Sequence, residues 1–361
     1  MKRFLLVVSL LLLGVVDVKS QQDSLRVMIG QMIMTGIGDY ADIDRNTQLQ
    51  QEIRDGIVGG VILFEKNIAS DNSKNKLKTL TNQLQSLSTI KLLIGIDQEG
   101  GKVNRLKEKY GFEKTVSAKY LGNLDNPDST RYYSEQTARN LNELGININF
   151  APDLDLEVYK DNPVIAKLGR SFGESEHLVT RHARATIESH RRYNVLTTVK
   201  HFPGHGSSHS DSHLGMTDVT NYWQYKELIP YRELIREGSV DCVMSAHIVN
   251  KHLDESGLPA TLSPFVINEI LRETYGFDGV VFSDDMQMHA ISSHYGFEQS
   301  IKLAINAGID ILMFCNNVPG NERRTATEIH AVIEELVNSG EVDRARIVSS
   351  YNRIMSLKSK K

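Results

Sequence analysis

Four histidines lie four residues apart in the segment KHFPGHGSSHSDSHLGM, which covers residues 200–216. They are His201, His205, His209 and His213. Histidines at this spacing could bind a metal ion, because residues four apart share one face of a helix. One of them could instead act as a general acid or base, because the unperturbed pKa of imidazole is about 6.5.

Proline and glycine within the segment argue against the helix. Pro203 has no backbone N–H to donate, and Gly204 and Gly206 favour loop geometry. The four rings therefore need not converge, and a zinc site loses its main support. The preceding residues VLTTVKHF are apolar and β-rich, which predicts a strand over 195–202 that runs into a polar loop. The two glycines would let this loop swing over a ligand and retract.

Short apolar runs of the same kind recur along the chain, with helical patterns between most of them. They cover residues 32–37, 59–64, 92–97, 146–152, 195–202, 240–247, 279–285 and 309–315. Strands that alternate with helices and are apolar on both faces predict an α/β fold, a single closed (β/α)8 TIM-type barrel. The alternative is a doubly wound open sheet, but the chain has no G-x-G-x-x-G motif and no P-loop to support nucleotide binding.

Five of these strands end in ionisable side chains. They are Asp97 and Glu99, Asp153 and Asp155, Lys200 and His201, His247, and Asp284 and Asp285. Because the carboxyl ends of barrel strands meet at one mouth, we expect these groups to lie close together. Such a pocket suits a ligand that is rich in hydroxyl groups.

The first twenty residues, MKRFLLVVSLLLLGVVDVKS, have a basic start, a short apolar run and small or aliphatic residues before Gln21. This pattern predicts a signal peptide over residues 1–20, export to the periplasm or outside the cell, and a catalytic barrel over 21–361. The apolar run is too short for a comfortable membrane span.

Net charge and cysteine content indicate which partners and cross-links to expect. The 361 residues carry a net charge of −4, so no basic surface for nucleic acid is expected. The two cysteines, Cys242 and Cys315, each lie in an apolar run and are expected to be buried free thiols, although a single disulfide stays possible in an exported protein. We expect a monomer.

The loop sequence KHFPGHG, followed by Asp211, Ser212 and His213, closely resembles the signature of glycoside hydrolase family 3 β-N-acetylglucosaminidases. The segments IDQEGGKVNRL, NFAPDLDL, RSFG, VMSAHI and GFDGVVFSDDMQM also occur in the family's order. The resemblance covers residues 24–358. It implies an enzyme that removes terminal β-linked N-acetylglucosamine from peptidoglycan fragments or related glycans, with no cofactor and no metal.

The resemblance also implies roles for individual residues. Asp284 resembles the nucleophile of the family, His213 its general acid/base, and Asp211 the partner that orients His213. The residues that resemble binders of the sugar ring are Asp97, Arg105, Arg170, Lys200 and His201. Here the sequence NPVIAKLGRSFG carries two more residues before the arginine than the family usually has.

The chemistry of the loop agrees with this assignment. In an extended loop, residues two apart project to the same side, so Asp211 could accept from one ring nitrogen of His213 and leave the other for the glycosidic oxygen. Asp285 should point away from Asp284 and act structurally. We expect His205 to make a hydrogen bond that orders the loop and His209 to be solvated.

Other functions remain open from the sequence. A zinc-dependent hydrolase would need three well-placed ligands and an open position. A phosphorylase could use the same covalent intermediate, because a histidine does not repel phosphate as a carboxylate would. A non-catalytic sugar-binding protein is less consistent with the presence of Asp284, Asp211 and His213 together. A family 3 β-glucosidase or xylosidase usually carries its acid/base outside this domain, so the Asp211–His213 loop and the lack of a second domain both disfavour it.

Overall fold

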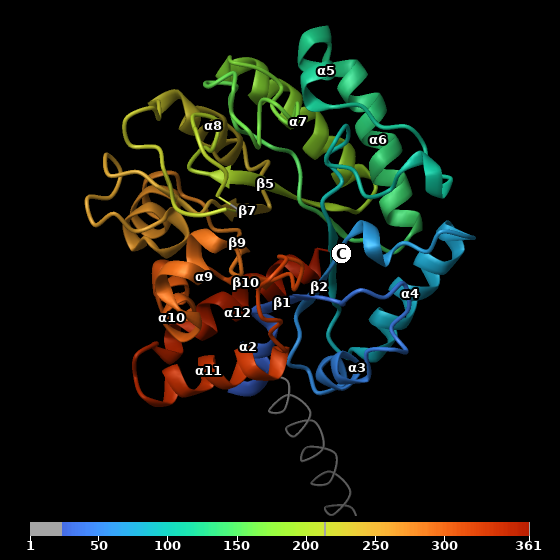
Figure 1. Ribbon diagram of the computed structural model, residues 1–361, viewed down its shortest axis with the longest axis vertical. Helices are drawn as coiled ribbons and strands as arrows, with labels where there is room; N and C mark the ends of the chain where they lie inside the picture. Colours follow the sequence, from blue (N-terminus) through green and yellow to red (C-terminus); the bar gives the residue numbers. More distant parts are fainter. Residues whose placement is uncertain (1–23, 213, 361) are drawn as a thin grey trace, which may run out of the picture.

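The computed structural model describes residues 24–212 and 214–360, which fold around a closed barrel of eight parallel strands (Figure 1). Around the barrel the order is β1, β10, β9, β7, β5, β4, β3 and β2. The strands are β1 Ile33–Gly36, β2 Gly60–Leu63, β3 Leu93–Ile96, β4 Ile148–Asn149, β5 Leu196–Phe202, β7 Cys242–Ser245, β9 Val280–Asp285 and β10 Ile311–Phe314. All eight fall within the runs expected from the sequence, which confirms the TIM-type barrel. The expected signal peptide lies outside the described residues.

The barrel interior is filled by side chains, as continuous apolar strands require. Phe150 and Phe282 meet edge to face there, with ring centroids 5.5 Å apart. Gly95 in β3 makes room for this pair, because a Cβ atom at that position would lie 2.7 Å from the ring of Phe150. The barrel interior is therefore a packed core.

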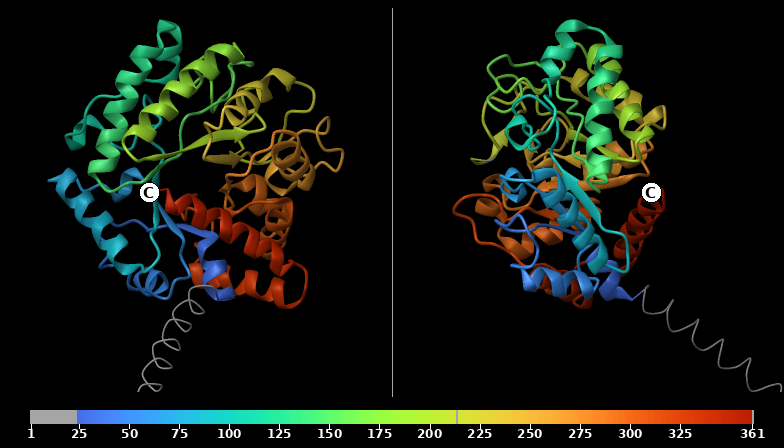
Figure 2. Two further views of the ribbon diagram at one scale, coloured as in Figure 1. Left: turned by 180° about the vertical axis from the view of Figure 1, so that it is seen from behind. Right: turned by 90° about the vertical axis from the view of Figure 1, so that its right-hand side faces the viewer.

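Helices surround the strands on the outside (Figures 1 and 2). They are α2 Leu25–Gln31, α3 Thr47–Arg54, α4 Ser73–Leu87, α5 Ala118–Leu124, α6 Pro127–Glu143, α7 Glu176–Arg192, α8 Ile229–Arg236, α9 His289–Tyr295, α10 Phe297–Ala307, α11 Ala326–Asn338 and α12 Arg344–Ser359. The first of these, α2, packs against the last two, α11 and α12, so the two ends of the described chain meet on the barrel wall.

Two features differ from a regular barrel. The segment that precedes β9 forms a π-helix, η5 Phe265–Thr274. A separate parallel pair, β6 Thr217–Asp218 and β8 Ile248–Val249, lies outside the barrel order and ties together the loops that follow β5 and β7.

None of the described helices has both the length and the apolar character to cross a membrane. Cys242 and Cys315 are free and buried, as expected.

Candidate active site

The carboxyl ends of the strands surround an open cavity of about 600 Å³. Seven of the eight side chains singled out in the sequence line it: Asp97, Arg105, Arg170, Lys200, His201, Asp211 and Asp284. The eighth, His213, lies outside the described residues. The structure therefore brings together residues that are up to 187 positions apart in the chain, from Asp97 to Asp284.

Lys200 forms the charged floor of this cavity. Its side chain is 2% exposed, and its Nζ lies 2.8 Å from Asp97 Oδ1 and 2.6 Å from Glu99 Oε1. Burial alone would lower the pKa of Lys200, but the two carboxylates raise it above its ordinary value. Burial would likewise raise the pKa of Asp97, which Lys200 and Arg105 hold below its usual range. Lys200 and Asp97 therefore stay charged at neutral pH.

Arg170 is fixed by a two-pronged contact with Glu99. Its Nη2 lies 2.8 Å from Glu99 Oε1, its Nε lies 2.9 Å from Oε2, and its Nη1 donates to Val164 O at 3.1 Å. Bidentate pairs of this kind are strong and directional. The two extra residues before Arg170 thus do not displace it from the cavity. The sequence places Glu99 at a strand end, but it does not show that this carboxylate binds both Arg170 and Lys200.

His201 uses both of its ring nitrogens within the protein. Nδ1 lies 2.6 Å from Asp155 Oδ2, and Nε2 lies 3.1 Å from Arg170 Nη2. Burial and the nearby Arg170 guanidinium lower the pKa of His201 to about 4, so the ring is neutral at pH 7. Because Arg170 can only donate, Nε2 accepts and Nδ1–H donates to Asp155.

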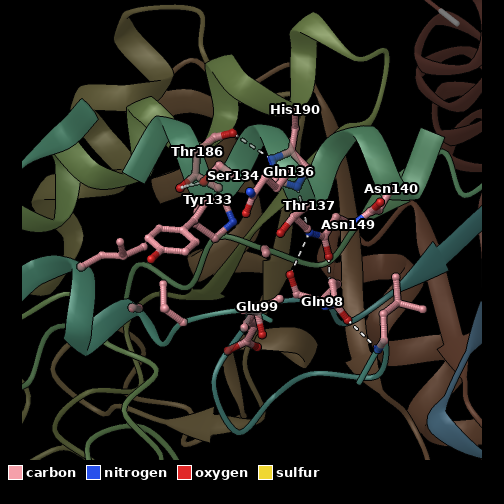
Figure 3. A pocket seen from close by; sticks show the side chains of 18 of the residues that line it. Gln98, Glu99, Tyr133, Ser134, Gln136, Thr137, Asn140, Asn149, Thr186 and His190 are labelled. Carbon is pink, nitrogen blue, oxygen red and sulfur yellow. Dashed lines mark hydrogen bonds between the residues drawn. The ribbon is translucent and has the colours of Figure 1, made fainter. Parts of the chain in front are cut away.

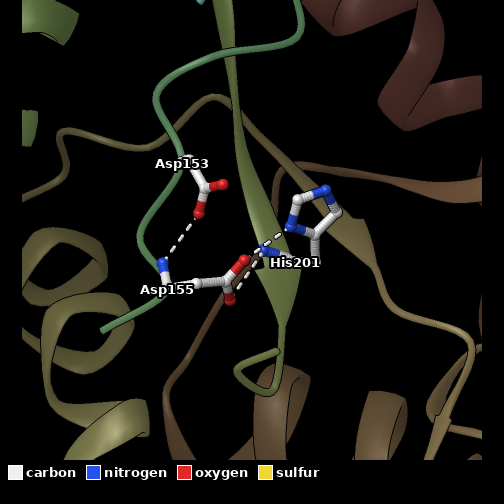
Figure 4. Close-up of side chains that lie close together, drawn as sticks. All are labelled: Asp153, Asp155 and His201. Atoms are coloured by element: carbon white, nitrogen blue, oxygen red, sulfur yellow. Dashed lines mark hydrogen bonds and ion pairs between the residues drawn. The ribbon is translucent and has the colours of Figure 1, made fainter. Parts of the chain in front are cut away.

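Asp153, Asp155 and His201 each offer one ligand atom within 4.8 Å of the others (Figure 4). Metal binding by this group is opposed by its surroundings. The Arg170 Nε atom lies 3.4 Å from Asp153 Oδ2, and burial together with the Asp155 charge raises the pKa of Asp153 well above its ordinary value. A guanidinium next to these carboxylates disfavours a cation, so the three side chains fit a hydrogen-bonded network better than a metal site.

Asp284 and Asp285 end strand β9 and differ in what they contact. Asp285 is buried, and its Oδ1 accepts from the backbone N–H groups of Gln287 and Cys315 at 3.1 and 3.2 Å. Burial raises its pKa to about 6. Asp284 is only half-buried, lines the cavity, and accepts from the Asp285 N–H through Oδ1 at 2.8 Å. Both aspartates line the cavity, so Asp285 does not point fully away from it as expected, but its contacts with two backbone N–H groups agree with a structural role.

The loop after β5 begins as a buried, pinned segment. Residues 203–208 are all buried. The His205 N–H donates to Asp155 Oδ1 at 2.7 Å, and its Nε2 lies 3.0 Å from Ser212 Oγ, so His205 orders the loop as expected. A Cβ atom at Gly206 would lie 1.8 Å from Leu156 O. This glycine therefore permits close packing, and the swing of the loop stays a prediction.

His209 is exposed, as expected, but it is not simply solvated. Its ring lies between those of Tyr159 and Tyr222, with centroids 3.8 and 3.9 Å away and ring planes within 3° and 21° of parallel. The three residues come from separate segments of the chain. No local sequence pattern could therefore have shown this contact.

A second, smaller cavity of about 50 Å³ lies behind the barrel wall, against α6 and α7 (Figure 3). Its polar side chains hold one another and the loop after β3. Gln98 Oε1 accepts from the N–H groups of Arg105 and Leu106 at 3.0 and 3.1 Å, and the Asn149 amide lies 3.0 Å from His190 Nε2. Gln98 thereby fixes the backbone that carries Arg105 into the larger cavity.

Known proteins are similar to this chain in sequence and in fold. The family described as "Glycosyl hydrolase family 3 N terminal domain" matches residues 24–357. A β-hexosaminidase from Tolumonas auensis is 34% identical over 285 residues, which cover 78% of this chain and 83% of that protein.

Solved structures agree. A glycoside hydrolase family 3 β-N-acetylglucosaminidase from a Paenibacillus species has a TM-score of 0.84 and 34% identity, over 93% of this chain and 62% of that one. A β-N-acetylhexosaminidase from Beutenbergia cavernae has a TM-score of 0.83 and 26% identity, over 93% of this chain and 98% of that one. The chain therefore belongs to glycosyl hydrolase family 3 and is a glycoside hydrolase related to the β-hexosaminidases.

Proposed function

We propose that this chain is an exported, retaining exo-β-N-acetylglucosaminidase that releases terminal β-linked N-acetylglucosamine from peptidoglycan fragments. The observation that carries the proposal is that Asp284 and Asp211 border the same cavity, above a floor of charged side chains around Lys200. The names of the relatives, which are β-hexosaminidases and β-N-acetylglucosaminidases, support the same class of substrate.

In the proposed reaction Asp284 attacks the anomeric carbon and forms a covalent glycosyl-enzyme, while His213 protonates the leaving oxygen. His213 then takes a proton from water, which attacks the same carbon and restores the original configuration. Asp211 orients the imidazole of His213. A rigid β9 supports the attack, because the neighbouring Asp285 is held by two backbone N–H groups.

The remaining charged side chains are proposed to bind the sugar ring. Asp97 and Arg105 border the cavity above Lys200, and Arg170 is held in place by Glu99. Such fixed donors and acceptors can bind ring hydroxyls and an N-acetyl group without reorganising. The buried Lys200 closes the bottom of the cavity, which favours the end of a glycan over its middle.

Incubation of the purified mature protein with N-acetylglucosaminyl–N-acetylmuramyl fragments, chitobiose and aryl β-glucosides tests the substrate. We expect free N-acetylglucosamine from the first substrate and little turnover of the glucosides. The same assay with added phosphate separates hydrolysis from phosphorolysis, since a phosphorylase would release the sugar 1-phosphate. Release of glucose in preference to N-acetylglucosamine would contradict the proposal.

Export and oligomeric state are part of the same proposal. The basic start and short apolar run before Gln21 support cleavage of residues 1–20. N-terminal sequencing of the protein from its native host should begin near Gln21, and an intact Met1 on active protein would reject export. Light scattering of the mature protein should give the mass of a monomer.

A further inference from the structure

The loop that carries Asp211 is held at one point by three stacked rings. The imidazole of His209 lies almost parallel to the ring of Tyr159 on one side and to that of Tyr222 on the other. Aromatic pairs of this kind are stabilising beyond the burial of their area.

Both tyrosines stand on segments that are themselves held in place. Tyr159 follows β4, and its backbone N–H donates to Gly206 O at 3.2 Å. Tyr222 follows β6, and its N–H donates to Val219 O at 2.9 Å. His209 therefore bridges two anchored parts of the barrel mouth, at the point where the loop changes from buried to exposed residues.

Other contacts also hold the described residues of the outer loop. Ser210 Oγ donates to Thr217 Oγ1 at 3.1 Å, and Ser212 Oγ lies 3.0 Å from His205 Nε2. The Leu214 side chain is 79% exposed, so it adds little apolar burial. Exposed segments open locally at small free-energy cost. The stacked rings add to the contacts that keep this part of the loop in place.

We propose that Tyr159, His209 and Tyr222 form an aromatic clamp that positions the loop bearing Asp211 and His213. His209 is then a positioning residue, two positions before Asp211 and four before His213. The clamp maintains the population in which Asp211 borders the cavity, and the rate falls with that population when the clamp is lost. The inference rests on the roles proposed above for Asp211 and His213.

The test compares four variants of the mature protein. His209→Ala and Tyr222→Ala remove one ring each, His209→Phe keeps a flat ring without nitrogen, and His252→Ala removes an exposed histidine elsewhere. Hydrogen–deuterium exchange of the peptide covering residues 208–216 measures the loop directly. Steady-state kinetics on an N-acetylglucosaminyl disaccharide measure its effect on the reaction.

We expect exchange in the loop to be about tenfold faster in His209→Ala and Tyr222→Ala, and kcat on the disaccharide to fall by a similar factor. KM should change little, because the sugar-binding floor around Lys200 is untouched. His209→Phe and His252→Ala should resemble the wild type in both measurements.

Three results would overturn the clamp: unchanged exchange in His209→Ala, faster exchange with unchanged kcat, or a His209→Phe variant that behaves like His209→Ala. Failure of the proposed function has a different signature. If His213→Ala keeps full activity on the disaccharide, the roles of Asp211 and His213 fail, whatever the exchange of the loop shows.

Discussion

At the carboxyl end of β9, two neighbouring aspartates have the same chemistry but different surroundings. Both border the cavity, but Asp284 is half-buried, whereas Asp285 is buried and its carboxylate is bound to two backbone N–H groups. Asp284→Ala should abolish nearly all turnover, because it removes the nucleophile. Asp285→Asn should keep the mechanism, because an amide oxygen can still accept from Gln287 and Cys315.

The nucleophile can be identified without rate measurements by trapping the glycosyl-enzyme. A 2-fluoro sugar makes this intermediate accumulate, and peptide mapping then locates the labelled residue. The label should be on residue 284. Labelling of Asp285, or of any residue outside β9, would reject the assignment of Asp284.

Protonation by His213 matters most when the leaving oxygen is a poor leaving group, as in a natural disaccharide. His213→Ala should therefore lower glycosylation by the disaccharide roughly 10²–10⁴-fold, while an activated aryl glycoside is partly spared. Hydrolysis of the intermediate still needs a base, so a burst and a low apparent KM are expected on the aryl substrate. Azide should restore turnover, because it needs no deprotonation.

In the same experiment, Asp211→Ala should lower the rate of glycosylation by the disaccharide less than His213→Ala does, because the imidazole remains and only its orientation is disturbed. His205 is no control for catalysis, since its ring contacts Ser212 in the same loop. Equal slowing of both substrates by His213→Ala, with no burst and no azide rescue, would remove His213 from the acid/base role.

At the scale of elements, the loop after β5 depends on a carboxylate that lies beneath it. Glu227 Oε2 accepts from the Gly206 N–H at 3.0 Å, and its Oε1 accepts from the Gln224 N–H at 3.2 Å. Burial raises the pKa of Glu227 to about 7 from an ordinary value of 4.5. Between these two values the folded protein binds more protons than the unfolded chain.

The contribution of Glu227 to stability is therefore present in full below pH 4.5 and is lost as the pH rises through 7. Glu227→Gln should remove this dependence. Relative to the variant, the wild type should lose free energy of unfolding from pH 4.5 to 7, by at most about 3 kcal/mol. Urea unfolding of both proteins across this range measures the difference. Parallel curves would show that Glu227 does not titrate in the folded protein.

The sequence sufficed to predict the strands, because eight apolar runs alternate with helical patterns and parallel strands bring their carboxyl ends to one mouth. It also indicated which side chains gather there. It could not show how they are held, because those contacts join distant segments. The Glu99 contacts with Arg170 and Lys200, and the two tyrosines around His209, are of this kind.

Backbone details were also beyond the sequence. The glycines at 204 and 206 suggest a flexible loop. A glycine can serve either flexibility or close approach of two backbone segments, and only the position of Leu156 O shows that Gly206 allows close approach. The Lys200–His201 peptide bond is cis, and bonds of this kind are too rare outside X-Pro to be predicted from residue types. The π-helix η5 has the apolar periodicity of an ordinary helix.

At the scale of the whole molecule, a buried lysine joins the two ends of the described chain. Lys358 in α12 donates from Nζ to Gln31 Oε1 in α2 at 2.6 Å and to Gly59 O, next to β2, at 2.8 Å. Burial lowers the pKa of Lys358 to about 7 from an ordinary value of 10.5. The same packing that joins α12 to α2 thus brings the pKa of the Lys358 amine close to neutral pH.

This contact predicts a dependence of stability on alkaline pH. Between pH 7 and 10.5 the unfolded chain binds one more proton at Lys358 than the folded protein does, so the stability contributed by this group rises with pH. It is present in full above pH 10.5 and is lost as the pH falls through 7.

Lys358→Met, which fills a similar volume without a titrating group, should lack this rise, and Lys360→Met on the exposed end of the same helix should keep it. Denaturant unfolding of the three proteins at pH 7, 8 and 9 measures the effect. A Lys358→Met curve parallel to the wild type would mean that Lys358 stays charged when folded, and the closing contact would then be an ammonium bound to two oxygens.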